Sequence, residues 1–110
     1  MSPESSELVL FTDNTEPLYR QKIAIFRALA KKKDRGTYDS RLAPQAFGAL
    51  LNSAAKKYAR EFGSPHDRWN SLFSPTQRHV AAVHLAEEFL DWYRTDYTPP
   101  APKRRVQSGR

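Results

Sequence analysis

Basic side chains recur along this sequence at spacings that could place them on common helix faces. Two sets stand out: Arg20, Arg27 and Lys31, and then Lys56, Lys57 and Arg60. Residues three, four or seven positions apart lie on one side of an α-helix, because a turn contains 3.6 residues. Lysine and arginine on such a face bind phosphate groups and position a protein on nucleic acid without reading its sequence.

Further cations extend both sets. Lys32, Lys33 and Arg35 crowd the end of the first set, and a tail after Pro102 begins with three bases. The predicted nucleic-acid surface, for DNA or RNA, comprises Arg20, Arg27, Lys31, Lys32, Lys33, Arg35, Lys56, Lys57, Arg60, Lys103, Arg104 and Arg105. The alternative is a solvated surface, with residues 31–35 placed only to favour the carbonyl end of a helix.

The distribution of charge supports the first interpretation. The net charge is +6, and residues 17–62 hold eleven Lys or Arg against three acids. Residues 1–16 carry four acids and no base, so the molecule is electrically polarised. A field of this kind attracts polyanions or an acidic protein surface, and salt weakens the attraction.

The sequence contains no motif typical of a catalytic site or a metal site. There is no cysteine and there are only four glycines, and no Gly-rich phosphate loop or nucleophile elbow occurs. His84 and Glu88 are four residues apart, but two ligands do not make a metal site. Glu87, Glu88 and Asp91 alternate with apolar residues and indicate a solvated helix face. We therefore predict a non-enzymatic protein without metal or cofactor.

Two other binding modes remain open. The run from Thr76 to His79 at a helix start is weakly similar to the reading helix of a helix-turn-helix. Large amphipathic side chains are typical of protein interfaces and also of bundle cores, and this chain has many: Tyr19, Tyr38, Tyr58, Trp69, Trp92, Tyr93 and Tyr97. A host protein or a second copy of the chain is thus the rival partner.

The elements that must position these side chains are helical. Residues 42–62 have apolar side chains at three-and-four spacing and end at a Gly-Ser-Pro stop, which predicts the central helix. A first helix begins after Thr15, with Pro17 in its first turn, and ends at Gly36. A last helix runs from Pro75 to about Tyr97 behind a capping box formed by Ser74 and Gln77.

These elements predict an all-α fold, a small bundle of three main helices plus one short helix at residues 66–73. Residues 15–97 form the bundle domain. Residues 1–14 form a polar acidic leader, a flexible arm whose apolar run 8–11 either docks on its own domain or pairs with a partner. Residues 98–110 form a disordered basic tail. Without an apolar span or a secretory signal, we predict a cytoplasmic protein that does not enter membranes.

Two segments within residues 18–93 carry a resemblance. They are KKKDRGTYD (residues 31–39) and AAKKYAREFG (residues 54–63). With them the chain resembles a family of small, largely uncharacterised helical proteins encoded by phages and bacterial mobile elements. The resemblance implies no established activity or site residue. It implies a protein that acts by binding, either to nucleic acid or to a host protein such as a restriction or CRISPR defence component.

Overall fold

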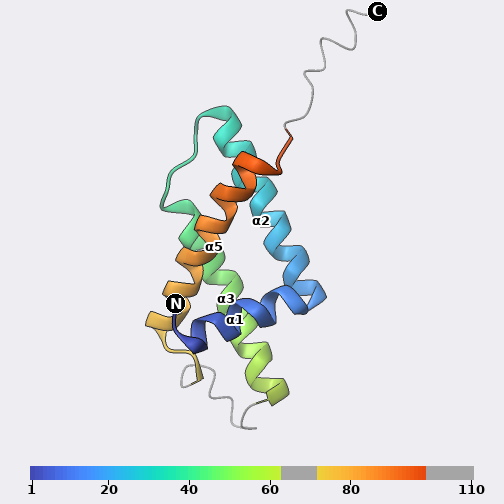
Figure 1. Cartoon of the computed structure of the whole chain (residues 1–110), viewed down its shortest axis with the longest axis vertical. Helices are drawn as coiled ribbons and strands as arrows, with labels where there is room; N and C mark the ends of the chain where they lie inside the picture. The colour runs from blue at the N-terminus through green and yellow to red at the C-terminus, as the bar shows by residue number, and fades with distance from the viewer. Residues whose placement is uncertain (63–71, 99–110) are drawn as a thin grey trace, which may run out of the picture.

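The computed structural model describes residues 1–62 and 72–98, which form four α-helices and contain no strand. They are α1 (Pro3–Asn14), α2 (Glu16–Arg35), α3 (Leu42–Phe62) and α5 (Pro75–Thr95) (Figure 1). The predicted all-α bundle is confirmed. The short helix predicted at residues 66–73 lies mostly outside the described residues, and residues 99–110 of the predicted tail lie wholly outside them.

Local sequence signals explain where the long helices begin and end. Gly36 closes α2 in the left-handed conformation, with φ of 75°, which glycine adopts without strain. The side chain of Ser74 accepts the N–H of Gln77 at 3.2 Å, and the Gln77 side chain accepts the N–H of Ser74 at 2.9 Å. α3 begins at Leu42, so Pro44 falls in its first turn, where its missing N–H is tolerated.

The core lies where the three long helices meet. Phe26 of α2, Phe47 of α3 and Phe89 of α5 are almost fully buried. The Phe26 ring centroid is 5.6 Å from each of the other two, in edge-on geometry that aromatic rings favour. This packing turns one face of α2 and of α3 inward and leaves the opposite faces to solvent.

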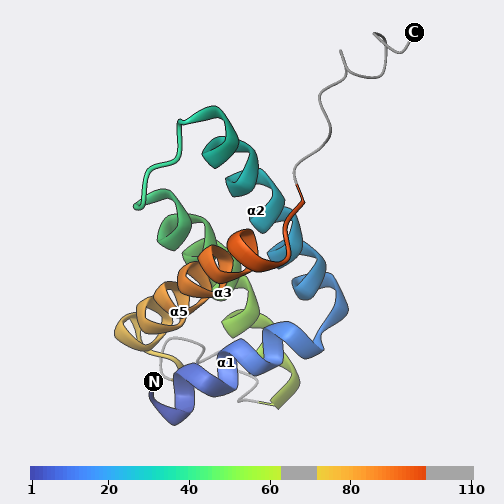
Figure 2. The ribbon, with the colours of Figure 1, turned by 45° about the horizontal axis from the view of Figure 1, so that its top comes forward.

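The N-terminal segment differs from the sequence-based prediction because it is a helix of the bundle. Residues 1–14 were predicted to be a flexible arm whose run 8–11 either docks on its own domain or pairs with a partner. Leu8 and Val9 of this run are buried in the core, so the run does dock, but it belongs to a regular helix, α1, which packs on α5, α3 and α2 (Figures 1 and 2). Its buried positions are Ser5, Leu8, Val9 and Thr12. These are spaced at i, i+3, i+4 and i+7, the pattern of a helix that packs through one face. The bundle therefore starts at α1.

Two of the buried positions of α1 carry hydroxyl groups, so its apolar residues alone do not show the helical spacing. The Ser5 hydroxyl donates to the backbone carbonyl of Gln77 at 2.9 Å, and the Thr12 hydroxyl donates to the Leu8 carbonyl at 2.9 Å. Buried hydroxyls that are hydrogen-bonded in this way avoid the cost of an unsatisfied polar group.

None of the helices in residues 1–62 and 72–98 is long and apolar enough to span a membrane.

Candidate nucleic-acid interface

The solvent face of α2 carries the first predicted set of cations. Arg20, Arg27 and Lys31 are all exposed. Arg20 forms an ion pair with Glu16 one turn earlier, and both side chains are exposed, so the pair contributes little to stability. Within the part of the chain that the structure describes, Arg27 and Lys31 form no ion pair. Their charges are available to a ligand.

The last turn of α2 divides its cations between two environments. Lys32 and Arg35 are exposed. The ammonium group of Lys33 instead lies 4.8 Å from the ring centroid of Tyr38 and 5.1 Å from that of Tyr93. A cation over two aromatic faces is held by their quadrupoles, and Lys33 is half-buried there. We therefore assign Lys33 to the packing of α2 on α5 rather than to the outer surface.

The cations of α3 lie far from those at the end of α2. The two helices run in opposite directions, so Lys56 and Arg60 are at the end of the bundle away from the last turn of α2 (Figure 1). Lys56 is fourteen residues beyond the first residue of α3, which corresponds to about 21 Å along the axis. Lys57 pairs with Glu61 at 3.1 Å. The structure therefore divides the predicted surface into two groups.

The basic tail starts beside the first of these groups. The hydroxyls of Tyr93 and Tyr97 donate to the two oxygens of Asp34, at 2.6 Å and 2.8 Å. Asp34 is in the last turn of α2, so these bonds attach the last turn of α5 and the residues just after it to α2. The three tail bases at 103–105 lie outside the described residues.

The same hydrogen bonds fix the ionisation of this junction. Donation from Tyr93, and then from Tyr97, lowers the pKa of Asp34 below its ordinary value. The bond to Asp34 in turn raises the pKa of each tyrosine. At neutral pH, Asp34 is thus an anion whose two oxygens are already occupied by hydroxyl donors. Both oxygens of Asp34 therefore serve to attach residues 93 and 97 to α2.

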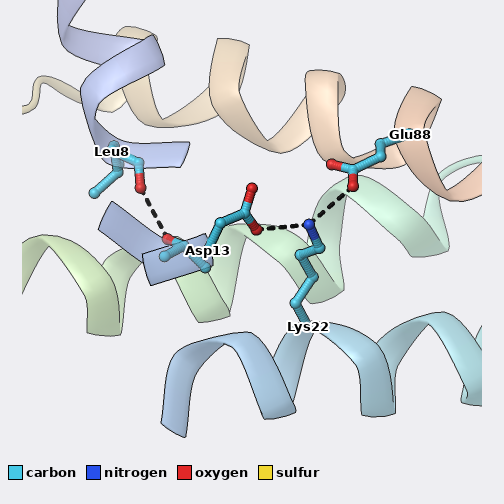
Figure 3. Close-up of polar contacts among 5 residues, drawn as sticks. Leu8, Asp13, Lys22 and Glu88 are labelled. Carbon is cyan, nitrogen blue, oxygen red and sulfur yellow. Dashed lines mark hydrogen bonds and ion pairs between the residues drawn. The ribbon is translucent and has the colours of Figure 1, made fainter. Parts of the chain in front are cut away.

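Sequence reasoning missed a third group, the Lys22 clasp, formed by Lys22 with Asp13 and Glu88. Lys22 belongs to α2, yet its side chain is only 3% exposed. Its ammonium group donates to Asp13 of α1 at 2.6 Å and to Glu88 of α5 at 2.9 Å (Figure 3). One buried cation thereby joins three helices.

The Lys22 clasp is suited to holding the fold together and not to catalysis. Burial opposes the charged ammonium, but hydrogen bonds to Asp13 and Glu88 outweigh it, so the pKa of Lys22 is raised. A nucleophilic or basic lysine needs a lowered pKa instead. Its position could have been found from the spacing Leu18, Lys22, Phe26, which places the lysine on the buried stripe of α2.

Residues 76–79 at the start of α5 are poorly arranged to contact DNA bases as the second helix of a helix-turn-helix does. Gln77 is engaged in the capping box, and the Arg78 guanidinium donates to the carbonyl of Phe73 at 2.6 Å. Only Thr76 and His79 of the four predicted side chains are exposed. Base readout needs several side chains directed outward together, so this arrangement does not favour it.

The outer face of α5 combines apolar and titratable side chains. Val80, Val83 and Leu90 are 36–37% exposed, and His79, His84 and Glu87 line a shallow pocket beside Val80 and Val83. Within residues 1–62 and 72–98, no three His, Asp or Glu side chains gather as metal ligands would. The three predicted acids separate: Glu87 is exposed, Glu88 belongs to the Lys22 clasp, and Asp91 lies 3.4 Å from Arg94.

Comparison with known proteins identifies no family for this chain. No family model matches the chain, and no curated protein or solved structure matches it significantly. The resemblance to proteins of phages and mobile elements stays a prediction. Function must be argued from the surface itself.

Proposed function

We propose that this protein binds nucleic acid through Arg27 and Lys31 of α2 together with the basic residues 103–105. The observation that carries the proposal is the attachment of Tyr93 and Tyr97 to Asp34. It starts the tail beside the cationic end of α2, so helix and tail cations are available to one polyanion.

The binding that this arrangement supports is electrostatic. Arg27 and Lys31 are one turn apart, about 6 Å along the helix axis. Each strand of a duplex presents one phosphate for about every 3.4 Å of rise along the duplex axis, so the two cations can meet neighbouring phosphates. No set of side chains directed at base edges accompanies them, so affinity should depend on phosphate contacts and hardly on sequence.

The test is the binding of labelled duplex and single-stranded oligonucleotides, followed by fluorescence anisotropy at two salt concentrations. With about five phosphate contacts, affinity should fall several hundred-fold between roughly 50 and 200 mM salt. Replacing Arg27 and Lys31 by alanine should weaken binding at least about tenfold, equally for unrelated sequences.

The matched control removes the same charge from the other end of the bundle. Lys56→Ala with Arg60→Ala also deletes two exposed cations, but on α3. This variant should bind nearly as well as the parent protein. Equal losses for the two variants would mean that only net charge matters, and no binding at low salt would refute the proposal.

Association with a protein, as in an inhibitor or adaptor of host defence, is the second candidate. It is favoured by the exposed apolar side chains Val80, Val83 and Leu90 on α5, because such residues mark protein contacts when they share a face. Val83→Glu should abolish such an association and leave oligonucleotide binding unchanged. Native mass spectrometry with purified candidate defence proteins would record the difference.

A further inference from the structure

A shallow hollow lies on the outer surface of α2, beside the cations of the proposed function. It has a volume of about 270 Å³ and is lined by Tyr19, Arg20, Ile23, Ala24 and Arg27, all residues of α2. Ile23 is half-buried and the other four are exposed, so Ile23 is the deepest part of its floor. This volume lies just below the range of pockets that enclose a drug-sized molecule. The hollow therefore suits one flat ring laid on the surface of the helix.

Tyr19 supplies the aromatic wall of this hollow. It is 43% exposed, and among the described residues its ring contacts no other aromatic ring. The ammonium of Lys22 lies over the ring, 5.6 Å from its centroid. Because Lys22 is itself held by Asp13 and Glu88, this contact keeps the ring in place. A ring that is already positioned loses little freedom when a flat ligand stacks on its exposed side.

Positive charge continues from the hollow along α2. Arg27 borders the hollow and Lys31 follows one turn later, and both are exposed. From Tyr19 they lie about 12 and 18 Å along the helix axis. Both fall within the arc of the helix that the hollow covers, about 140° from Tyr19 to Ala24. A polyanion that enters the hollow can therefore continue over these two cations.

The other end of the hollow is not cationic. The guanidinium of Arg20 pairs there with the carboxylate of Glu16, so the two charges offset each other. Glu16 would also repel a phosphate placed beside it. A strand bound at the hollow is thus expected to run from Tyr19 toward Lys31.

We propose that the hollow binds one unpaired base of a single-stranded nucleic acid, stacked on Tyr19, with neighbouring phosphates on Arg27 and Lys31. The proposal rests on the proposed function and adds to it the class of nucleic acid. Proteins that bind single strands combine a positively charged track for the backbone with aromatic side chains on which bases stack. Every base has a π-face, so such binding is as independent of sequence as phosphate contacts are.

The interior of a duplex cannot use the hollow in the same way. Its bases are paired and stacked on one another, so only their edges are accessible from the grooves. A duplex can still place phosphates on Arg27 and Lys31. The base contact and the phosphate contacts are therefore separable by experiment.

Two strands of about ten nucleotides test the base contact on the unmodified protein. One is oligothymidylate, and the other has the same sugars and phosphates but no bases. In fluorescence anisotropy at low salt, the protein should bind the thymidine strand at least about fivefold more tightly, the smallest effect expected of one aromatic stack. An oligouridylate strand is the RNA counterpart. The strands that bind more tightly than the base-free strand identify the ligand as DNA, RNA or both.

Variants assign this difference to Tyr19. Tyr19→Leu removes the ring and keeps every cation, so the thymidine strand should then bind no more tightly than the base-free strand. The affinity for the base-free strand and for a duplex should stay unchanged. Tyr19→Phe keeps the ring and should keep the preference. Phe62→Leu is the matched control, because it removes a 67% exposed ring from α3, and it should also keep the preference.

Two results would overturn the base site and leave the proposed function intact, provided that binding still depends on Arg27 and Lys31. They are equal affinity of the parent protein for the thymidine and base-free strands, and a preference that survives Tyr19→Leu. Absence of binding to every strand at low salt would refute both proposals. The circular dichroism spectrum of Tyr19→Leu checks that its helices are intact. If this variant unfolds, Tyr19→Gln replaces it with the same expected loss, because glutamine suits an exposed helix position.

Discussion

The two faces of α2 use the same kind of side chain for opposite purposes. Lys22 lies on the inner face, 3% exposed, with its charge matched by Asp13 and Glu88. Arg27 and Lys31 lie on the outer face in solvent, with no ion pair among the described residues. The inner cation is committed to the fold, and the outer cations remain able to bind another molecule.

The physical reason is desolvation. A buried ammonium loses its hydration and must be compensated by carboxylates, whereas an exposed one keeps its water until a ligand displaces it. Substitutions on the inner face should therefore change stability, and substitutions on the outer face should change binding. Three experiments on stability test this division.

The largest effect should come from removing both acids of the Lys22 clasp. Asp13→Asn with Glu88→Gln keeps the shapes but leaves the buried ammonium without an anion. The free energy of unfolding should fall by about 3 kcal/mol in urea denaturation. The control adds Lys22→Met to these two changes, because no buried charge is then left without a partner, and this triple variant should stay within about 1 kcal/mol of the parent. A stable double variant would contradict the assignment.

A smaller effect should appear at alkaline pH. The pKa of Lys22 is raised from its model-compound value of 10.5, so its contribution is fully present below that value. It is lost as the pH rises through the higher folded pKa. The parent protein should therefore lose more stability than Lys22→Met between about pH 8 and pH 12, measured as the urea midpoint. Tyr93 and Tyr97 titrate in both proteins and cancel in the comparison. Parallel pH profiles would show that Lys22 does not couple to folding.

The smallest effect should come from the outer face. Arg27→Ala with Lys31→Ala changes two exposed positions of α2, so the free energy of unfolding should move by less than about 0.5 kcal/mol. The same urea titration measures it. A loss comparable to that of the clasp variant would mean that the outer cations also support the fold, and the comparison between the two faces would fail.

Sequence patterns predicted much of the fold because the relevant forces act locally. The bounds 42–62 of α3 follow from helical periodicity, and the start of α5 follows from the capping box at Ser74. The helical state of α1 was missed, because Ser5 and Thr12 occupy half of its buried positions. The partner of the Ser5 hydroxyl, the Gln77 carbonyl, is 72 residues away, which no local pattern reveals.

The candidate surface was predictable by residue type but not by arrangement. Lysine and arginine on helix faces indicated a basic surface, yet α2 and α3 run in opposite directions, which separates the cations in the last turn of α2 from those in the last turns of α3. Lys33 was predicted to contact phosphate, and only the approach of Tyr38 and Tyr93 shows where its charge is held.

By itself, the amino-acid sequence determined the three long helices, their caps and the excess of positive charge, since these depend on neighbours a few residues apart. Tertiary structure alone decided which cations are buried, which face solvent, and which acids they meet. Packing brings together groups such as Asp13, Lys22 and Glu88 from three helices. Whether a charge stabilises the fold or awaits a ligand depends on how much water its surroundings leave it.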